Sequence, residues 1–115
     1  MKITEYKIDD YSVEIYAGDL KGARTRWGEK AIYLYSGGRE VAQAVFAREG
    51  AKLPEPYLSG GKIYYFAPAS QFADVIDLLR NEKEVFIAWK PVSDPREEDD
   101  GDAYFFTAPK DVEPD

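Results

Sequence analysis

The sequence predicts a single α+β domain over residues 1–115, with an antiparallel β-sheet of meander order and one main helix packed on one face. Apolar residues repeat at helical spacing over about residues 69–81. Several other segments alternate apolar and polar residues with the period of a half-buried strand. Paired glycines between two of these segments mark a hairpin turn. Together these patterns indicate a sheet crossed by one helix.

The helix and the strand after it contain the most apolar part of the chain. One helical face carries residues at spacing i, i+3, i+4 and i+7, namely Phe72, Val75, Ile76 and Leu79. Either Ser70 caps the start of the helix, or Pro68 occupies its first turn. The apolar run 85–89 follows within a predicted strand over 84–89, which we expect to be covered on both faces.

The remaining strands are expected in chain order on both sides of this helix. Residues 2–8 and 11–17 form strands, either joined by a tight turn at Asp9–Asp10 or continuous as one bent strand. Residues 31–47 form a hairpin that turns at Gly37–Gly38. The segment 48–61 is a long loop, 62–66 is a strand that leads into the helix, and 103–107 is the last strand.

Tyrosines are frequent in the predicted strands. A helix of about 12 residues is only ~18 Å long and covers part of one sheet face. The strands direct further aromatic residues to one side or the other: Tyr16, Tyr33, Tyr35 and one of Tyr64 and Tyr65. An aromatic face without a covering layer indicates a homodimer interface or a ligand platform.

Composition excludes several kinds of chemistry. The chain has no Cys and no His, which removes disulfides, thiolate metal sites, the commonest general base and the commonest zinc ligand. Its apolar runs are far shorter than the ~20 residues of a membrane span, and its first residues lack the apolar region of a signal peptide. We therefore expect a cytoplasmic, non-catalytic protein without a metal or cofactor, and without a membrane partner.

The net charge of −7 is concentrated in the last quarter of the chain. Residues 1–90 hold 13 acidic and 13 basic residues, whereas 91–115 hold 9 and 2. An acidic loop is expected at about 93–102 and a frayed acidic tail at about 110–115. The loop either is solvated, binds a hard cation or shields a basic loop, although its spacing does not match an EF-hand. Its acidic residues are Glu97, Glu98, Asp99, Asp100 and Asp102.

The basic residues gather in the glycine-rich loop 18–30. Lysine and arginine could neutralise phosphates there while aromatic rings stack on bases, as in single-strand binders. The alternative is a solvated loop whose tryptophan packs on the sheet. The candidate nucleic-acid-binding residues are Lys21, Arg24, Arg26, Trp27, Lys30, Tyr33 and Tyr35.

A carboxylate pair on the helix is a further candidate for acid–base chemistry. Asp74 and Asp77 share the polar helix face at i and i+3. An ion pair with Arg80 accounts for Asp77 equally well, and perturbed carboxylates must be enclosed to act in catalysis. The sequence thus gives this pair little support as a catalytic site.

The block 72–89 resembles small bacterial proteins, including cyanobacterial ones, that carry a similar F-x-x-V-x-D-L-L-R-N-E-K-x-V run, and the resemblance extends more weakly back to the segment 62–66. Some such proteins have the fold of the Whirly class of single-stranded-DNA-binding transcriptional regulators. The resemblance implies an antiparallel sheet crossed by a helix, and chains that dimerise. The segment nearest to the K-G-K-A-A-L strand motif of that class is 28–32. Trp27, directly before this segment, stands where the motif has its first lysine, and Glu29 stands at the middle position.

Two functions remain open at this point. The first is a small interaction or regulatory protein that forms a homodimer through its aromatic sheet face. The second is a regulator-like protein that binds single-stranded DNA or RNA through the basic loop 21–30 and the sheet tyrosines.

Overall fold

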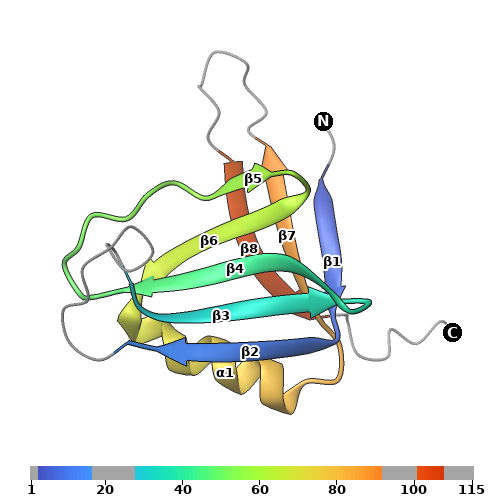
Figure 1. Ribbon diagram of the computed structural model, residues 1–115, viewed down its shortest axis with the longest axis horizontal. Coiled ribbons are helices and arrows are strands. Elements are labelled where there is room, and N and C mark those ends of the chain that lie inside the picture. The colour runs from blue at the N-terminus through green and yellow to red at the C-terminus, as the bar shows by residue number, and fades with distance from the viewer. Residues whose placement is uncertain (1–2, 17–27, 92–100, 108–115) are drawn as a thin grey trace, which may run out of the picture.

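The computed structural model describes residues 3–16, 28–91 and 101–107. The elements in chain order are β1 (Thr4–Ile8), β2 (Asp10–Ile15), β3 (Gly28–Ser36), β4 (Arg39–Ala47), β5 (Tyr57–Ser59), β6 (Lys62–Pro68), α1 (Phe72–Asn81), β7 (Val85–Pro91) and β8 (Gly101–Thr107). A 3₁₀ turn over Ala69–Gln71 precedes α1, so the helical segment matches the predicted range 69–81. The α+β class with one helix is confirmed (Figure 1).

The strands form two sheets rather than one. The large sheet has the order β2-β3-β4-β6-β5, and the small sheet has the order β1-β7-β8. The small sheet lies behind the large one and crosses it steeply, and α1 lies on the same side (Figure 1). The small sheet and α1 therefore cover the inner side of the large sheet together, because α1 is too short to cover it alone.

The chain changes sheet at Asp9. β1 pairs with β7 in the small sheet, and β2 pairs with β3 in the large sheet. The Asp9 carboxylate accepts the Gly37 N–H at 2.7 Å, and its own N–H donates to the Tyr35 carbonyl at 2.9 Å. These bonds hold the corner, where Asp9 alone separates two strands of different sheets, so the segment is neither a tight hairpin turn nor one continuous strand.

Pairing in the large sheet departs from a meander at β4 and β6, which run parallel. The predicted loop 48–61 contains β5, and β5 pairs antiparallel with β6. Gly60 and Gly61, with φ of 59° and 80°, form the turn between these two strands. The hairpin places β6 between β5 and β4. In this position β6 runs antiparallel to β5 and parallel to β4.

The core lies between the large sheet and its two inner covers. Its largest fully buried side chains are Phe46, Ile32, Leu34, Ile63 and Ile87. Phe46 meets Phe72 of α1 edge to face, with ring centroids 5.4 Å apart. Ala42 and Ala44 on β4 are completely buried, and such small side chains allow close approach of the opposing layer. The predicted apolar face of α1 packs on this core, with Val75 buried and Leu79 partly buried.

The helix starts differently from the prediction. Ser70 belongs to the 3₁₀ turn, and its N–H donates to the Glu49 carboxylate at 3.0 Å. Pro68 has extended backbone before that turn and does not occupy the first turn of α1. Because the 3₁₀ turn comes first, α1 begins at Phe72. The backbone N–H of Ser70, near the helix start, is satisfied by the Glu49 side chain from the loop after β4. Within the described ranges, no helix is both long and apolar enough to span a membrane.

Candidate functional site

The outer side of the large sheet carries a row of polar and aromatic side chains. The strand register aligns Ser12, Tyr33, Gln43, Tyr64 and Tyr57 across all strands of this sheet. We call the outward-facing set the tyrosine face: Ser12, Glu14, Tyr16, Tyr33, Tyr35, Gln43, Val45, Tyr57, Tyr64 and Phe66. Both α1 and the small sheet pack on the opposite side (Figure 1). The face is not evenly exposed, because Tyr33 is only 9% exposed, whereas Tyr64 is half-buried and Tyr57 is 45% exposed.

Three rings stack near the β5 edge of the tyrosine face. Tyr57 and Tyr64 have centroids 4.5 Å apart with an interplanar angle of 16°, and Phe66 lies 6.1 Å from Tyr57. Tyr57 remains 45% exposed. Burial, and then the neighbouring Tyr64, raise the pKa of Tyr57, so its hydroxyl stays neutral at ordinary pH. The result is a flat aromatic surface with polar edges, a combination enriched at protein interfaces.

At the other end of the face, Glu14 connects two tyrosines. Its Oε1 accepts hydrogen bonds from the hydroxyls of Tyr16 at 2.7 Å and Tyr33 at 2.8 Å. Ser12 and Tyr35 hydroxyl oxygens lie 3.3 Å apart. Burial and the bond to Glu14 both raise the pKa of Tyr16. These bonds fix the ring orientations before any partner arrives, which lowers the entropy lost on binding.

A second charged group borders the middle of the face. Glu40 Oε2 accepts from Gln43 Nε2 at 2.8 Å and pairs with Lys62 Nζ at 3.0 Å. The bond to Glu40 raises the pKa of Lys62. Because Lys62 is already paired and Glu14 and Glu40 are both acidic, this part of the surface does not favour a phosphate backbone.

The structure separates the predicted nucleic-acid-binding residues. Lys30 lies on the inner side of β3, where its Nζ is 5.0 Å from the centroid of the Phe72 ring. Tyr33 and Tyr35 lie on the tyrosine face, as their bonds to Glu14 and Ser12 show. Lys30 therefore does not join them in one site. The other predicted members lie outside the described residues: Lys21, Arg24, Arg26 and Trp27.

The acidic candidates that the structure describes do not form a cation-binding cluster. Asp102 is exposed on β8, opposite Lys90 in the strand register. Asp74 and Asp77 are exposed on α1. Over residues 3–16, 28–91 and 101–107, no cluster of acidic side chains is suited to hold a metal. The rest of the acidic loop lies outside the described residues: Glu97, Glu98, Asp99 and Asp100.

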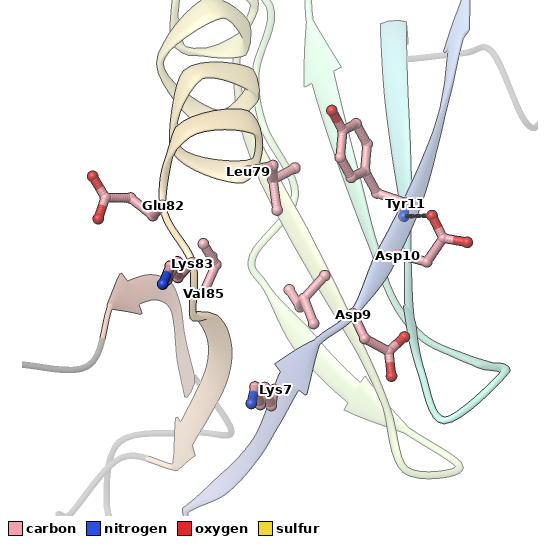
Figure 2. Close-up of a pocket in the computed structure, with 9 residues that line it drawn as sticks. Lys7, Asp9, Asp10, Tyr11, Leu79, Glu82, Lys83 and Val85 are labelled. Atoms are coloured by element: carbon pink, nitrogen blue, oxygen red, sulfur yellow. Dashed lines mark hydrogen bonds between the residues drawn. The ribbon is translucent and has the colours of Figure 1, made fainter.

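A pocket of about 320 Å³ lies between the end of α1 and the corner where β1 becomes β2. In Figure 2, the Tyr11 ring and Leu79 face each other across it, while the Asp9 and Asp10 carboxylates point away from the helix. Asp9 and Asp10 accept the N–H groups of Gly37 and Tyr11. Lys7, also at this pocket, pairs with Glu84 at 3.3 Å. Lys7, Asp9 and Asp10 therefore have structural partners, and the pocket is lined by polar and apolar groups in nearly equal measure.

The sequence analysis does not identify several members of the tyrosine face, among them Tyr57, Glu14 and Gln43. The sequence predicts a loop at Tyr57, although Gly60–Gly61 carry the same turn signal as Gly37–Gly38. Glu14 and Gln43 show their role only through the strand register. The Tyr64/Tyr65 ambiguity is also resolved, because Tyr65 faces inward and its hydroxyl donates to Gln71 Oε1 at 2.9 Å.

Comparison with known proteins found no matching family model, no matching curated protein and no matching solved structure. The Whirly resemblance therefore stays a prediction from the block 72–89.

Proposed function

We propose that this chain is a non-catalytic interaction protein that forms a homodimer through its tyrosine face. The observation that carries the proposal is the continuous row Gln43, Tyr64 and Tyr57 beside the buried Tyr33, on the side of the large sheet opposite α1 and the small sheet. Flat faces rich in tyrosine, with few charged residues at their centre, are typical of protein interfaces.

The chemistry of the face suits a copy of itself. A twofold axis would bring tyrosine rings of one copy against rings of the other, where stacked and edge-on pairs add about 0.5–1.5 kcal/mol each beyond area burial. The carboxylates of Glu14 and Glu40 already accept hydrogen bonds within the chain, so they enter the interface with partners.

The pocket at the end of α1 supports a non-catalytic role. Its carboxylates Asp9 and Asp10 bind backbone N–H groups of the fold, and Lys7 pairs with Glu84. Catalytic groups need perturbed pKa values and a geometry in which a base reaches the reacting atom. Asp9, Asp10 and Lys7 are instead bonded within the fold.

The test is the oligomeric state of matched variants by sedimentation equilibrium. Tyr64→Glu places a carboxylate at the centre of the face, and Tyr104→Glu makes the same change on β8 of the small sheet, where Tyr104 is 37% exposed. The native chain should reach twice its 13.0 kDa mass at high concentration. Tyr64→Glu should weaken dimerisation about tenfold or more because it buries an unpaired charge, and Tyr104→Glu should not.

Two results would contradict the proposal. One is a native chain that stays monomeric at high concentration. The other is equal behaviour of the two variants, since a general effect of added charge would then explain any loss.

The nucleic-acid interpretation remains a prediction with its own test. Salt-sensitive binding of a labelled single-stranded oligonucleotide, lost when Arg24 and Arg26 are replaced by alanine, would establish it. Binding that appears only after Glu97, Glu98, Asp99 and Asp100 are changed to amides would make the acidic loop a shield.

A further inference from the structure

The composition of the chain directs oxidation toward aromatic side chains. The chain has no Cys and a single Met, whose sulfur atoms are common targets of oxidants, but it has 9 Tyr. A one-electron oxidant that meets this chain therefore acts mainly on tyrosine and tryptophan. Where two tyrosines touch, such an oxidant can join their rings.

Two tyrosines of the tyrosine face are held ring against ring. Tyr57 on β5 pairs directly with Tyr64 on β6, across the hairpin that turns at Gly60–Gly61. Their ring centroids lie 4.5 Å apart, and their ring planes differ by 16°. The side chains of a direct cross-strand pair leave the sheet side by side, with Cβ atoms about 4.5–5.5 Å apart. Because the two side chains have equal length, the ring carbons next to their hydroxyls lie at similar heights above the sheet.

Two other tyrosines stack on phenylalanine instead. The Tyr65 ring meets Phe105 with centroids 4.9 Å apart, and the Tyr104 ring meets Phe106 at 5.9 Å. Phenylalanine has no phenolic hydroxyl and does not form a phenoxyl radical. These two contacts therefore cannot give the product that a tyrosine pair gives.

The pair is open to a reagent in solution. Tyr57 is 45% exposed, and Tyr64 beside it is half-buried. β5 is an edge strand of 3 residues, so β6 is its one neighbour in the sheet. Burial, and then the neighbouring Tyr64, raise the pKa of Tyr57, so the neutral phenol gives up a proton together with the electron. Water at the exposed side of Tyr57 can accept that proton.

We propose that Tyr57 and Tyr64 form an oxidative modification site, at which a peroxidase with hydrogen peroxide couples the two rings into dityrosine. Each phenol loses one electron to the oxidant and one proton to water, which leaves two phenoxyl radicals. A bond then forms between the ring carbons next to the two hydroxyls, and the hydrogens of these carbons return to the phenol oxygens. The two electrons and two protons that leave the pair reduce one hydrogen peroxide to two molecules of water.

The new bond would fasten the edge strand β5 to β6 covalently. Rings that are already in contact couple faster with each other than with a ring of another chain, because the fold has brought them together in advance. The inference goes beyond the proposed homodimer and does not rest on it. A dimer through the tyrosine face would cover the pair, so the reaction belongs to the free chain.

The experiment treats the full chain at high dilution with a peroxidase and hydrogen peroxide, and identifies linked tryptic peptides by mass spectrometry. Trypsin cuts after Lys52, Lys62 and Arg80, so Tyr57 lies in the peptide 53–62 and Tyr64 in the peptide 63–80. The oxidised native chain should keep the mass of one chain, less two hydrogen atoms, and should give these two peptides joined. Fragmentation should place the link at Tyr64 rather than at the neighbouring Tyr65, which faces inward.

Matched variants test the pairing. Tyr57→Phe and Tyr64→Phe keep the ring and remove the hydroxyl, so each should abolish the link, whereas Tyr65→Phe and Tyr104→Phe should keep it. Oxidation in urea should remove the preference for Tyr57 with Tyr64, because unfolding separates the rings. No link in the native chain, a link placed at Tyr65, or a link that survives Tyr57→Phe or Tyr64→Phe would overturn the inference.

The readout separates this inference from the proposed function. The link within one chain is identified at the mass of one chain, whereas a link between copies doubles that mass. A failure of dimerisation therefore leaves the expected link unchanged, and a missing link at high dilution leaves the dimer interface unaffected.

Discussion

Replacing Phe46 by alanine should cause a large loss of stability, because this residue joins α1 to the large sheet. Its side chain is completely buried, with Phe72 edge-on at 5.4 Å and Tyr65 at 6.2 Å. Removing a buried phenyl ring costs about 3–5 kcal/mol. The two aromatic contacts place Phe46 in the upper half of that range, at about 4–5 kcal/mol.

Urea unfolding followed by tryptophan fluorescence measures this loss. With a slope of about 2 kcal/mol per molar urea, in the middle of the usual range, the midpoint should fall by roughly 2–2.5 M. Tyr104→Ala, at a 37% exposed position, is the matched control and should cost less than about 1 kcal/mol. If Phe46→Ala costs no more than this control, the helix is not held to the sheet in the way described.

Three further predictions concern backbone and pH. Gly101→Ala should destabilise the fold by about 1–3 kcal/mol in the same assay, because a new Cβ would collide with the Trp89 indole. Gly38→Ala should cost about 1 kcal/mol in the same assay, because Gly38 has φ of 79°. The pKa of Tyr16 is raised from its usual 10.0 in the folded state, by burial and then by the bond to Glu14. The contribution of Tyr16 to the free energy of unfolding is therefore complete below about pH 10 and is lost as the pH rises further. In Tyr16→Phe, the free energy of unfolding should therefore fall less steeply at alkaline pH than in the native chain.

The sequence carried enough information for the helix and most strands. The spacing of Val75 and Ile76 identified α1, and Gly37–Gly38 identified the hairpin of β3 and β4. These are local signals, so they do not depend on what the segment meets in space. The change of sheet at Asp9 is different, because its cause is pairing with strands far along the chain.

The candidate site was harder to foresee. Period-two alternation alone places Lys30 on the opposite side of β3 from Tyr33 and Tyr35, so their separation was available from the sequence. The role of Glu14 could not be predicted from the sequence, because it depends on β2 lying beside β3 in one particular register. Tyr57 lies on the tyrosine face only because β5 pairs with β6. With three residues, β5 is too short to show a clear strand pattern in the sequence.

A dilution series followed by amide NMR shifts tests the central claim most directly. Self-association through the tyrosine face predicts concentration-dependent shifts at Tyr33, Gln43 and Tyr64. Val13 on the β2 edge and Tyr104 on the small sheet should not shift. Shifts confined to those two positions, or none at all up to the solubility limit, would contradict the assignment of this face as the dimer interface.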